Sequence, residues 1–250
     1  MDRIVAIAGK GGTGKSTISA LLIDWLIKNN KGSVLAVDAD PNSNLANYLG
    51  LSQKETVGDI IDDIAKHPDK VPASMGKNQY IEYRIQTTLT ESGGVDLLSM
   101  GRPEGPGCYC YANNALRGII EKLINSYDSI IIDNEAGMEH LSRRTTRKAD
   151  SLVIVSDFSA VGLRAAGRIL ELVKELELDV KNKFLIVNRA KKDLKLLRKE
   201  IDSLKIELIG VILEDKELLK LSVADKPVTA LKNNSIILKE IDRIGSRLWQ

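Results

Sequence analysis

The sequence predicts an α/β fold in which a mostly parallel sheet has helices on both of its faces. Short apolar runs of strand length alternate along the chain with longer segments whose apolar residues recur at helical spacing. Repeated strand–helix units of this kind build a parallel sheet, because each connecting helix packs against a face of it. A glycine-rich turn between the first strand-like run, residues 3–8, and the first helical segment is typical of the same fold class.

The composition fits a single globular domain over residues 1–250. Hydrophobic residues make up 43% of the chain and charged residues 28%, and we find no linker or internal repeat. The formal net charge is +2 and the Lys and Arg residues are scattered, so we expect no nucleic-acid partner. The first apolar run ends at Gly9, too early for a signal peptide or a membrane span, so we expect a cytoplasmic protein.

The glycine-rich turn carries the strongest functional pattern. Its GxGxxG spacing satisfies the fingerprint of dinucleotide-binding proteins, in which Asp38 or Asp40 would bind the ribose. The same segment satisfies the full phosphate-binding-loop pattern, and only that pattern has a use for Lys15 and Ser16. We therefore predict a nucleotide site in which Lys15 reaches the terminal phosphates and Ser16 binds Mg²⁺. The residues predicted to contact the nucleotide here are Gly9, Gly11, Gly12, Thr13, Gly14, Lys15, Ser16 and Thr17.

Two acids follow the second strand-like run, residues 33–38. Asp38 and Asp40 stand at the carboxyl end of this run, and in an open α/β sheet that end faces the ligand crevice. The structural alternative is a helix start, which Asn42 or Ser43 could equally cap. Two acids beside a proline at a strand end favour the functional interpretation.

A region from about residue 52 to residue 94 is less regular. Apolar spacing over 57–64 predicts one short helix, and we expect a small β element around 80–89. A third strand is predicted over 95–99. We interpret residues 52–94 as an excursion from the sheet, with no chemistry of its own.

The fourth strand, residues 129–133, ends in the best candidate for a Walker B aspartate. Asp133 is positioned to hold Mg²⁺ or a water on it. Residues 134–137 would form the loop that senses a γ-phosphate. The further expected elements are strands over 151–155, 183–187 and 207–213 and helices over 163–176, 194–204 and 236–248.

Both cysteines of the chain lie at the end of a Gly/Pro-rich run, residues 101–110. Cys108 and Cys110 either have no role, form a strained redox pair, or bind a metal through their thiolates. We favour metal binding, because the helix expected to follow Cys110 would lower its thiol pKa. One chain offers only half of a four-coordinate thiolate site, so a symmetric dimer would supply the other half. The ligands do not distinguish Ni²⁺ from Zn²⁺.

Three segments resemble the MinD/ParA/nitrogenase-iron-protein superfamily of P-loop NTPases, also called SIMIBI. Residues 9–16 look like its deviant Walker A motif, with the extra lysine at Lys10, and residues 38–41 are similar to its switch I. Asn188 and Arg189 look like its adenine-binding turn. Thr13 stands where many members have valine, which we take for a surface-loop variation.

Within that superfamily, residues 101–110 and 133–141 resemble the CooC/AcsF group. These are the nickel-inserting ATPases of carbon monoxide dehydrogenase and acetyl-CoA synthase. The resemblance implies Mg²⁺-dependent ATP hydrolysis, ATP/ADP and Ni²⁺ as ligands, a homodimer linked to nucleotide and metal, and one of those two enzymes as client.

The resemblance also implies roles for single residues. Lys10 would reach the nucleotide of the partner chain, where a second cation stabilises the transferring phosphoryl group. Asp40 would orient the attacking water, Asp38 would support the Mg²⁺ shell, and Asp133 would hold a water ligand of Mg²⁺. Lys15 completes the catalytic set.

Two other functions stay open. A positioning ATPase of the MinD/ParA type would need a membrane helix or a basic surface, but for the apolar stripe over 236–248 we favour packing on the sheet. We therefore expect no stable membrane association. An iron–sulfur carrier would also pool four cysteines in a dimer. His67 is expected to be solvated, and His140 is either a third metal ligand or a capping residue.

Overall fold

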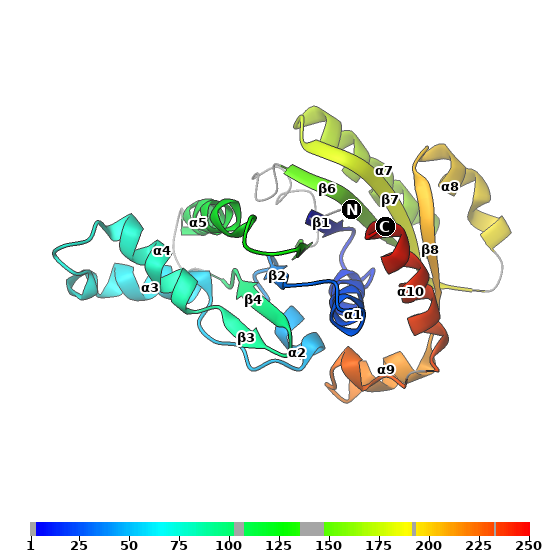
Figure 1. The fold of residues 1–250 in the computed structure, drawn as a ribbon. Coiled ribbons are helices and arrows are strands. Elements are labelled where there is room, and N and C mark those ends of the chain that lie inside the picture. Colours follow the sequence, from blue (N-terminus) through cyan, green and yellow to red (C-terminus); the bar gives the residue numbers. More distant parts are fainter. Residues whose placement is uncertain (1–3, 103–107, 136–147, 192–193, 233) are drawn as a thin grey trace.

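The computed structural model describes residues 4–102, 108–135, 148–191, 194–232 and 234–250, without the side chains of 108–111, 113 and 148. Eight strands of this part form one sheet in the order β3-β4-β2-β5-β1-β6-β7-β8 (Figure 1). All neighbours pair in parallel except β3 with β4, which confirms the predicted fold class. The strands are β1 Ile4–Ala8, β2 Val34–Asp38, β3 Thr90–Ser92, β4 Val95–Ser99, β5 Ser129–Asp133, β6 Lys148–Asp157, β7 Asp179–Ala190 and β8 Glu207–Leu213.

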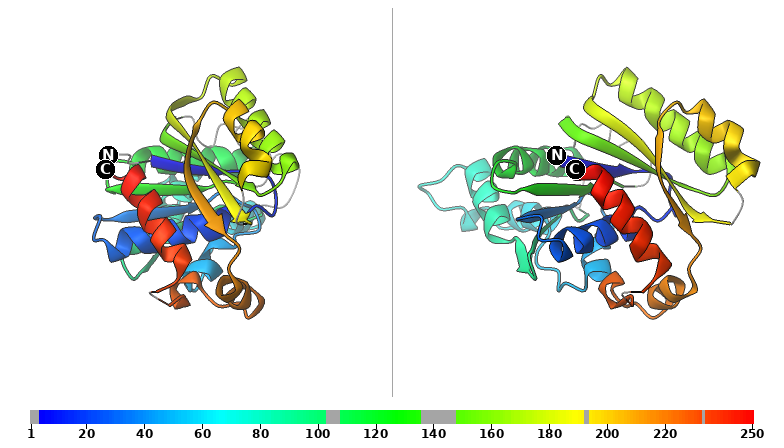
Figure 2. Two further views of the ribbon diagram at one scale, coloured as in Figure 1. Left: turned by 90° about the vertical axis from the view of Figure 1, so that its right-hand side faces the viewer. Right: turned by 45° about the vertical axis from the view of Figure 1, so that its right-hand side comes forward.

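Two hydrophobic cores cover the two faces of the sheet, because successive side chains of a strand point to opposite faces. In β1, Ile4, Ala6 and Ala8 belong to one core, whereas Val5 and Ile7 belong to the other. Figure 2 shows α7 and α8 on the first face and α1 and α10 on the second. The helices are α1 Lys15–Lys28, α2 Leu45–Leu49, α3 Val57–Lys66, α4 Lys77–Thr87, α5 Cys108–Leu123, α7 Ala160–Glu175, α8 Arg198–Ser203, α9 Lys216–Val223 and α10 Ile236–Leu248.

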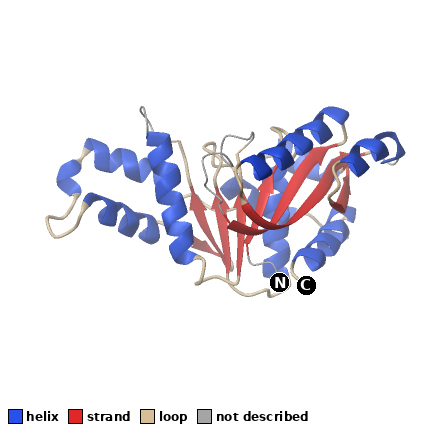
Figure 3. Cartoon of the chain, turned by 90° about the horizontal axis from the view of Figure 1, so that it is seen from above, coloured by secondary structure: helices blue, strands red, loops and turns tan. Residues whose placement is uncertain are grey.

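The β element expected around residues 80–89 is wrong, since α4 occupies this segment. Ile81 and Ile85 lie four residues apart and are both buried, so together they form one helical face against the core shared with α3 and α5. The nearest strand is the short β3, which begins only at Thr90 and pairs antiparallel with β4. Figure 3 shows this group of helices beside one edge of the sheet.

Two further boundaries differ from the expected ones. Residues 194–204 are not one helix but a 3₁₀ turn, Leu194–Leu197, followed by α8. The short helix α2 agrees with the helix start that was the structural alternative for residues after Asp40, whereas the short helix α9 was not predicted. The ends of β2, β4, β5 and β8 lie where the apolar runs placed them, whereas β6 and β7 extend beyond the expected 151–155 and 183–187 at both ends.

The apolar stripe of α10 packs inside the protein, as the structural interpretation of residues 236–248 predicted. Ile237, Ile241, Ile244 and Leu248 are all buried in the second core. The Trp25 indole N–H of α1 donates to Asp242 Oδ1 at 2.8 Å, which fixes α10 against α1. No helix in the described ranges is long and apolar enough to cross a membrane.

Candidate functional site

The phosphate-binding loop joins β1 to α1 and is held from the side by the end of β7. Gly14 precedes α1 with φ 94°, a left-handed conformation that favours glycine. A Cβ at Gly14 would lie 2.3 Å from Asn188 Nδ2, which donates instead to the Thr13 carbonyl at 2.8 Å. Arg189 Nη1 donates to the Gly12 carbonyl at 3.0 Å. The tertiary structure thus brings the loop and the Asn188–Arg189 pair together, although Thr13 and Asn188 are 175 residues apart in sequence.

Thr13 is not a surface-loop residue, contrary to the expectation from the sequence. Its side chain is fully buried, and its hydroxyl donates to the Lys10 carbonyl at 2.8 Å. The Thr13 backbone N–H donates to the same oxygen at 3.3 Å, so side chain and backbone close one turn around Lys10. Valine would fill the same space but would lose the first of these hydrogen bonds.

The two lysines of the loop lie in opposite environments. Lys15 is only 6% exposed, and burial lowers the pKa of its ammonium, against the opposing charges of Asp133, Asp40 and Glu135. A buried cation among carboxylates is suited to bind phosphate oxygens, because its charge is weakly screened. Lys10, in contrast, is exposed.

The two strand-end aspartates Asp38 and Asp133 are direct neighbours in the β2–β5 register. Burial, and to a smaller extent the neighbouring Asp133 carboxylate, raise the pKa of Asp38 to about 7. Burial also raises the pKa of Asp133 to about 6, against smaller opposing effects of Ser16, Lys15 and Ser19. Two buried carboxyl groups side by side resist ionisation unless a cation joins them.

The surroundings of Asp133 fit Mg²⁺. One carboxylate oxygen, Oδ1, accepts from the Ser19 hydroxyl at 3.1 Å, whereas Oδ2 is buried and has no hydrogen-bond partner within the described residues. The Ser16 hydroxyl is half-buried in the first turn of α1. Oxygen donors of this kind suit Mg²⁺, which when bound would neutralise phosphate charge. Asp133 and Ser16 are the residues that would hold it or its waters.

Asp38 and Asp40 are engaged differently. Asp38 accepts through Oδ1 from the Asp40 backbone N–H at 3.1 Å and through Oδ2 from the Leu45 N–H at 2.8 Å. It therefore holds the first N–H of α2, a task that the structural alternative assigned to Asn42 or Ser43. Asp40 is half-buried, and its Oδ1 accepts from the Asn42 backbone and side-chain amides, each at 2.9 Å. The arrangement favours Asp40 for the water-orienting role, which stays a prediction, and gives Asp38 a positioning role.

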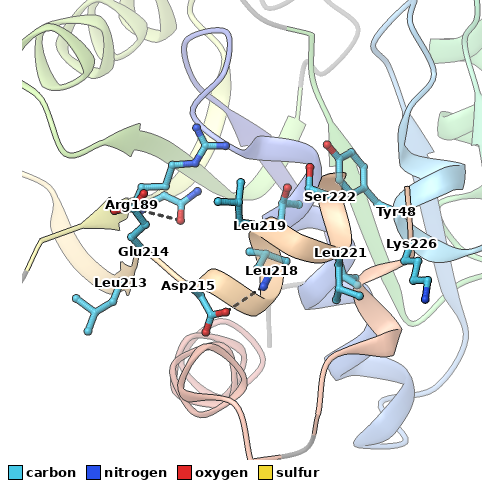
Figure 4. A pocket seen from close by; sticks show the side chains of 13 residues that line it. Tyr48, Arg189, Leu213, Glu214, Asp215, Leu218, Leu219, Leu221, Ser222 and Lys226 are labelled. Carbon is cyan, nitrogen blue, oxygen red and sulfur yellow. Dashed lines mark hydrogen bonds between the residues drawn. The ribbon is translucent and has the colours of Figure 1, made fainter. Parts of the chain in front are cut away.

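A cavity of about 260 Å³ opens beside the loop (Figure 4). We call it the nucleoside cavity, because the predicted adenine-binding turn lies in its wall. Asn188 and Arg189, the predicted adenine-binding turn, line it together with Thr17. Its opposite wall comes from α9 and its approach, including Leu213, Leu218 and Leu219, with Tyr48 from α2. Sequence reasoning missed this wall, because its residues carry no motif and meet the loop only in the folded chain.

Part of the predicted metal site lies outside the description. α5 begins at Cys108, but the side chains of Cys108 and Cys110 are not described, and His140 with residues 136–147 lies outside the described residues. His67 is exposed, as expected. In the described part of the chain no group of three or more His, Cys, Asp and Glu side chains is arranged to hold a metal ion.

Comparisons with known proteins agree with this geometry. Residues 4–228 match the family described as the CobQ/CobB/MinD/ParA nucleotide binding domain. The chain is 41% identical over 248 residues to an uncharacterised ATP-binding protein of Methanocaldococcus jannaschii, covering 98% of each chain. It is 30% identical to the carbon monoxide dehydrogenase accessory protein CooC of Rhodospirillum rubrum, over 69% of each chain.

Among solved structures, the MinD cell division protein of Aquifex aeolicus superimposes with a TM-score of 0.74. That pair is 25% identical and covers 98% of this chain and 96% of the other. The phosphate-binding loop, its buried lysine, the Mg²⁺-compatible aspartate and the family match all agree. The chain belongs to the CobQ/CobB/MinD/ParA nucleotide-binding family and is an ATPase.

Proposed function

We propose that this ATPase is a metallochaperone that binds Ni²⁺ between two copies of the chain and inserts it into carbon monoxide dehydrogenase or acetyl-CoA synthase. The observation that carries the proposal is the place of the cysteine pair in the fold. Cys108 starts α5, and the chain reaches it from β4, whose last residue Ser99 is the register neighbour of Asp38. The cysteine pair therefore follows, a few residues later in sequence, a strand that ends beside the predicted nucleotide site.

The chemistry of the segment supports metal as the cargo. A thiol near the start of a helix is stabilised as thiolate by the helix dipole, and α5 is 16 residues long. Two chains related by a two-fold axis would place four thiolates around one ion, which suits Ni²⁺ and also Zn²⁺. The likeness to the accessory protein CooC, which is named for carbon monoxide dehydrogenase, favours Ni²⁺ and that client.

Dimerisation would connect the two sites. Lys10 is exposed beside the phosphate-binding loop, so in a face-to-face dimer it would contact the partner's nucleotide. ATP binding would then close the dimer and assemble the thiolate site, and hydrolysis would open it and release the ion to the client. ATP, Mg²⁺ and reduced thiols are all available in the cytoplasm, where we place the protein.

Metal titration tests the proposal. Wild type and a Cys108→Ser/Cys110→Ser variant are titrated anaerobically with Ni²⁺ and with Zn²⁺, with and without ATP, and metal per chain is measured after gel filtration. We expect one ion per two chains in wild type and none in the variant. Equal stoichiometry in both proteins would remove the cysteines from the function, and a brown protein with charge-transfer absorbance would favour an iron–sulfur cluster instead.

A positioning ATPase of the MinD type is the second candidate, favoured by the structural likeness over nearly the whole chain. Such a function needs a surface that binds a membrane. The stripe of α10 does not provide it, because Ile237, Ile241 and Ile244 are buried in the core. Co-sedimentation with anionic liposomes in the presence of ATP separates the candidates, since only the positioning ATPase should pellet with the vesicles.

A further inference from the structure

The side chain of Ser43 connects two segments. One is the loop after β2 that carries Asp40, and the other is the chain after β4, which precedes Cys108 and Cys110 in sequence. Ser43 has φ 48°, and its backbone N–H donates to the Asp40 carbonyl at 2.9 Å. Its hydroxyl donates to the same carbonyl at 3.4 Å and accepts from the Gly101 N–H at 3.2 Å. The hydroxyl thus joins the loop that carries Asp40 to the chain immediately after β4.

Gly101 is enclosed on its other side by the start of α3. It is buried with φ 67°, and a Cβ on it would lie 2.0 Å from the Thr56 hydroxyl oxygen. The preceding residue, Met100, donates its N–H to the Asp38 carbonyl and accepts from the Gly58 N–H, each at 2.8 Å. Residues 100–101 are therefore held between the loop that carries Asp40 and the first turn of α3. A shift of that loop must then displace the start of α3.

The start of α3 is held by hydrogen bonds of its own. Thr56 and Asp59 form a capping box, with the Asp59 N–H donating to the Thr56 hydroxyl at 3.1 Å and the Thr56 N–H donating to Asp59 Oδ2 at 2.9 Å. The buried face of α3 shares one core with α5, on which Leu116 and Ile119 are fully buried. In Figure 1 these two helices lie on the same side of the molecule. A displacement at Gly101 would therefore reach α5, which begins at Cys108.

We propose that Ser43 is a positioning residue that couples the nucleotide state to the environment of Cys108 and Cys110. The proposal rests on the proposed function, because metal transfer is what gives the coupling a purpose. Its test does not depend on metal binding. When Asp40 and its loop move toward a bound γ-phosphate, the Ser43 hydroxyl pulls on Gly101, and α3 and α5 follow as one packed unit. The hydroxyl is the part of this path that a substitution removes without touching the nucleotide, the core or the cysteines.

Thiol labelling measures the coupling without any metal. Cys108 and Cys110 are the only cysteines of the chain, so the rate of alkylation by N-ethylmaleimide reports on them alone. The protein is first treated with EDTA, which removes bound metal. The labelling rate is then measured with saturating ADP. It is measured again with a saturating non-hydrolysable ATP analogue, after Mg²⁺ in excess of the chelator has been added. We expect the two rates to differ about fivefold or more in wild type, the lower end of ordinary coupling between sites.

Two substitutions of Ser43 separate the hydroxyl from the backbone. Ser43→Ala and Ser43→Gly both remove the hydroxyl, but glycine favours a positive φ and alanine disfavours it. We expect both variants to bind nucleotide like wild type, to hydrolyse ATP and to label at nearly equal rates with the two nucleotides. Ser92→Ala, which removes an exposed serine hydroxyl at the end of β3, should keep the wild-type ratio.

The proposal is overturned if both Ser43 variants keep the wild-type ratio of labelling rates, or if wild type shows no dependence on nucleotide. A loss of the ratio in only one variant would assign the effect to the backbone and equally overturn it. The metal titration is independent of this result. If the titration fails while both Ser43 variants lose the ratio, the nickel function falls and the coupling stands.

Discussion

Replacing Asp133 by Asn should stabilise the nucleotide-free protein and abolish its ATPase activity. The Asp133 side chain is 1% exposed and is the register neighbour of Asp38, so its negative charge is unfavourable until a cation binds. Its pKa is raised from 3.8 in the unfolded chain to about 6 in the folded one. The folded state therefore binds this proton more tightly, and the free energy of unfolding falls as the pH rises from about 4 to about 6.

The magnitude follows from the shift. A displacement of about 2 pKa units corresponds to about 3 kcal/mol of lost stability above pH 6, at about 1.4 kcal/mol per unit. An Asn at this position keeps the acceptor for Ser19 but places an amide N–H₂ where Oδ2 has no hydrogen-bond partner among the described residues. That group costs about 1–2 kcal/mol, so we expect a net gain of about 1–2 kcal/mol at pH 8.

Thermal unfolding in EDTA, without nucleotide, measures the effect. A gain of that size corresponds to a Tm higher by about 2–8 °C for a chain of this length. The gain should shrink to about zero at pH 4.5, where most of the cost of the charge is relieved by protonation. An Asn variant that is no more stable at pH 8, or equally more stable at both pH values, would refute the reasoning. Ser129→Ala is the control without a change of charge, because this buried strand residue also has a side-chain oxygen with no hydrogen-bond partner in the part of the chain that the structure describes.

Two further predictions concern nucleotide binding and turnover. Lys10→Ala should bind ATP like wild type but lose turnover, whereas Lys15→Ala should lose nucleotide binding. Titration with a fluorescent nucleotide measures binding, and phosphate release measures turnover. An unchanged kcat in the Lys10 variant would contradict a role of Lys10 in a dimer. Leu218→Asp, at the wall of the nucleoside cavity, should raise the Kd for ATP about tenfold or more by placing a charge against the base. The exposed Val223→Asp of the same helix should leave the Kd unchanged, and equal effects of both substitutions would show that α9 is merely destabilised.

Local sequence was sufficient for the parts of the site that depend on short segments. The phosphate-binding loop and the aspartates at the ends of β2 and β5 were predicted at the positions where the structure has them. Their recognition needs only a run of apolar residues, a turn of glycines and a few polar residues at fixed spacing. These are properties of adjacent residues, so they are readable along the chain.

The roles of Asp38 and Thr13 depended on distant or three-dimensional contacts. That Asp38 holds the start of α2 follows from the position of Leu45, seven residues away. Thr13 looked like a surface residue because loops are usually exposed, yet it is buried in the fold and its carbonyl accepts a hydrogen bond from Asn188 of β7. Neither contact leaves a periodic trace in the sequence.

Residues 52–94 show the same limit in the fold. The sequence around Ile81 and Ile85 is polar and short, and its helical character is decided by the core that these two residues share with α3 and α5. The wall of the nucleoside cavity is built in the same way, from α2, α9 and the end of β7. Local patterns therefore predicted the residues of the phosphate site, whereas long-range packing determined which residues line the adjacent cavity and placed Ser43 against Gly101, because such contacts exist only after the chain has folded.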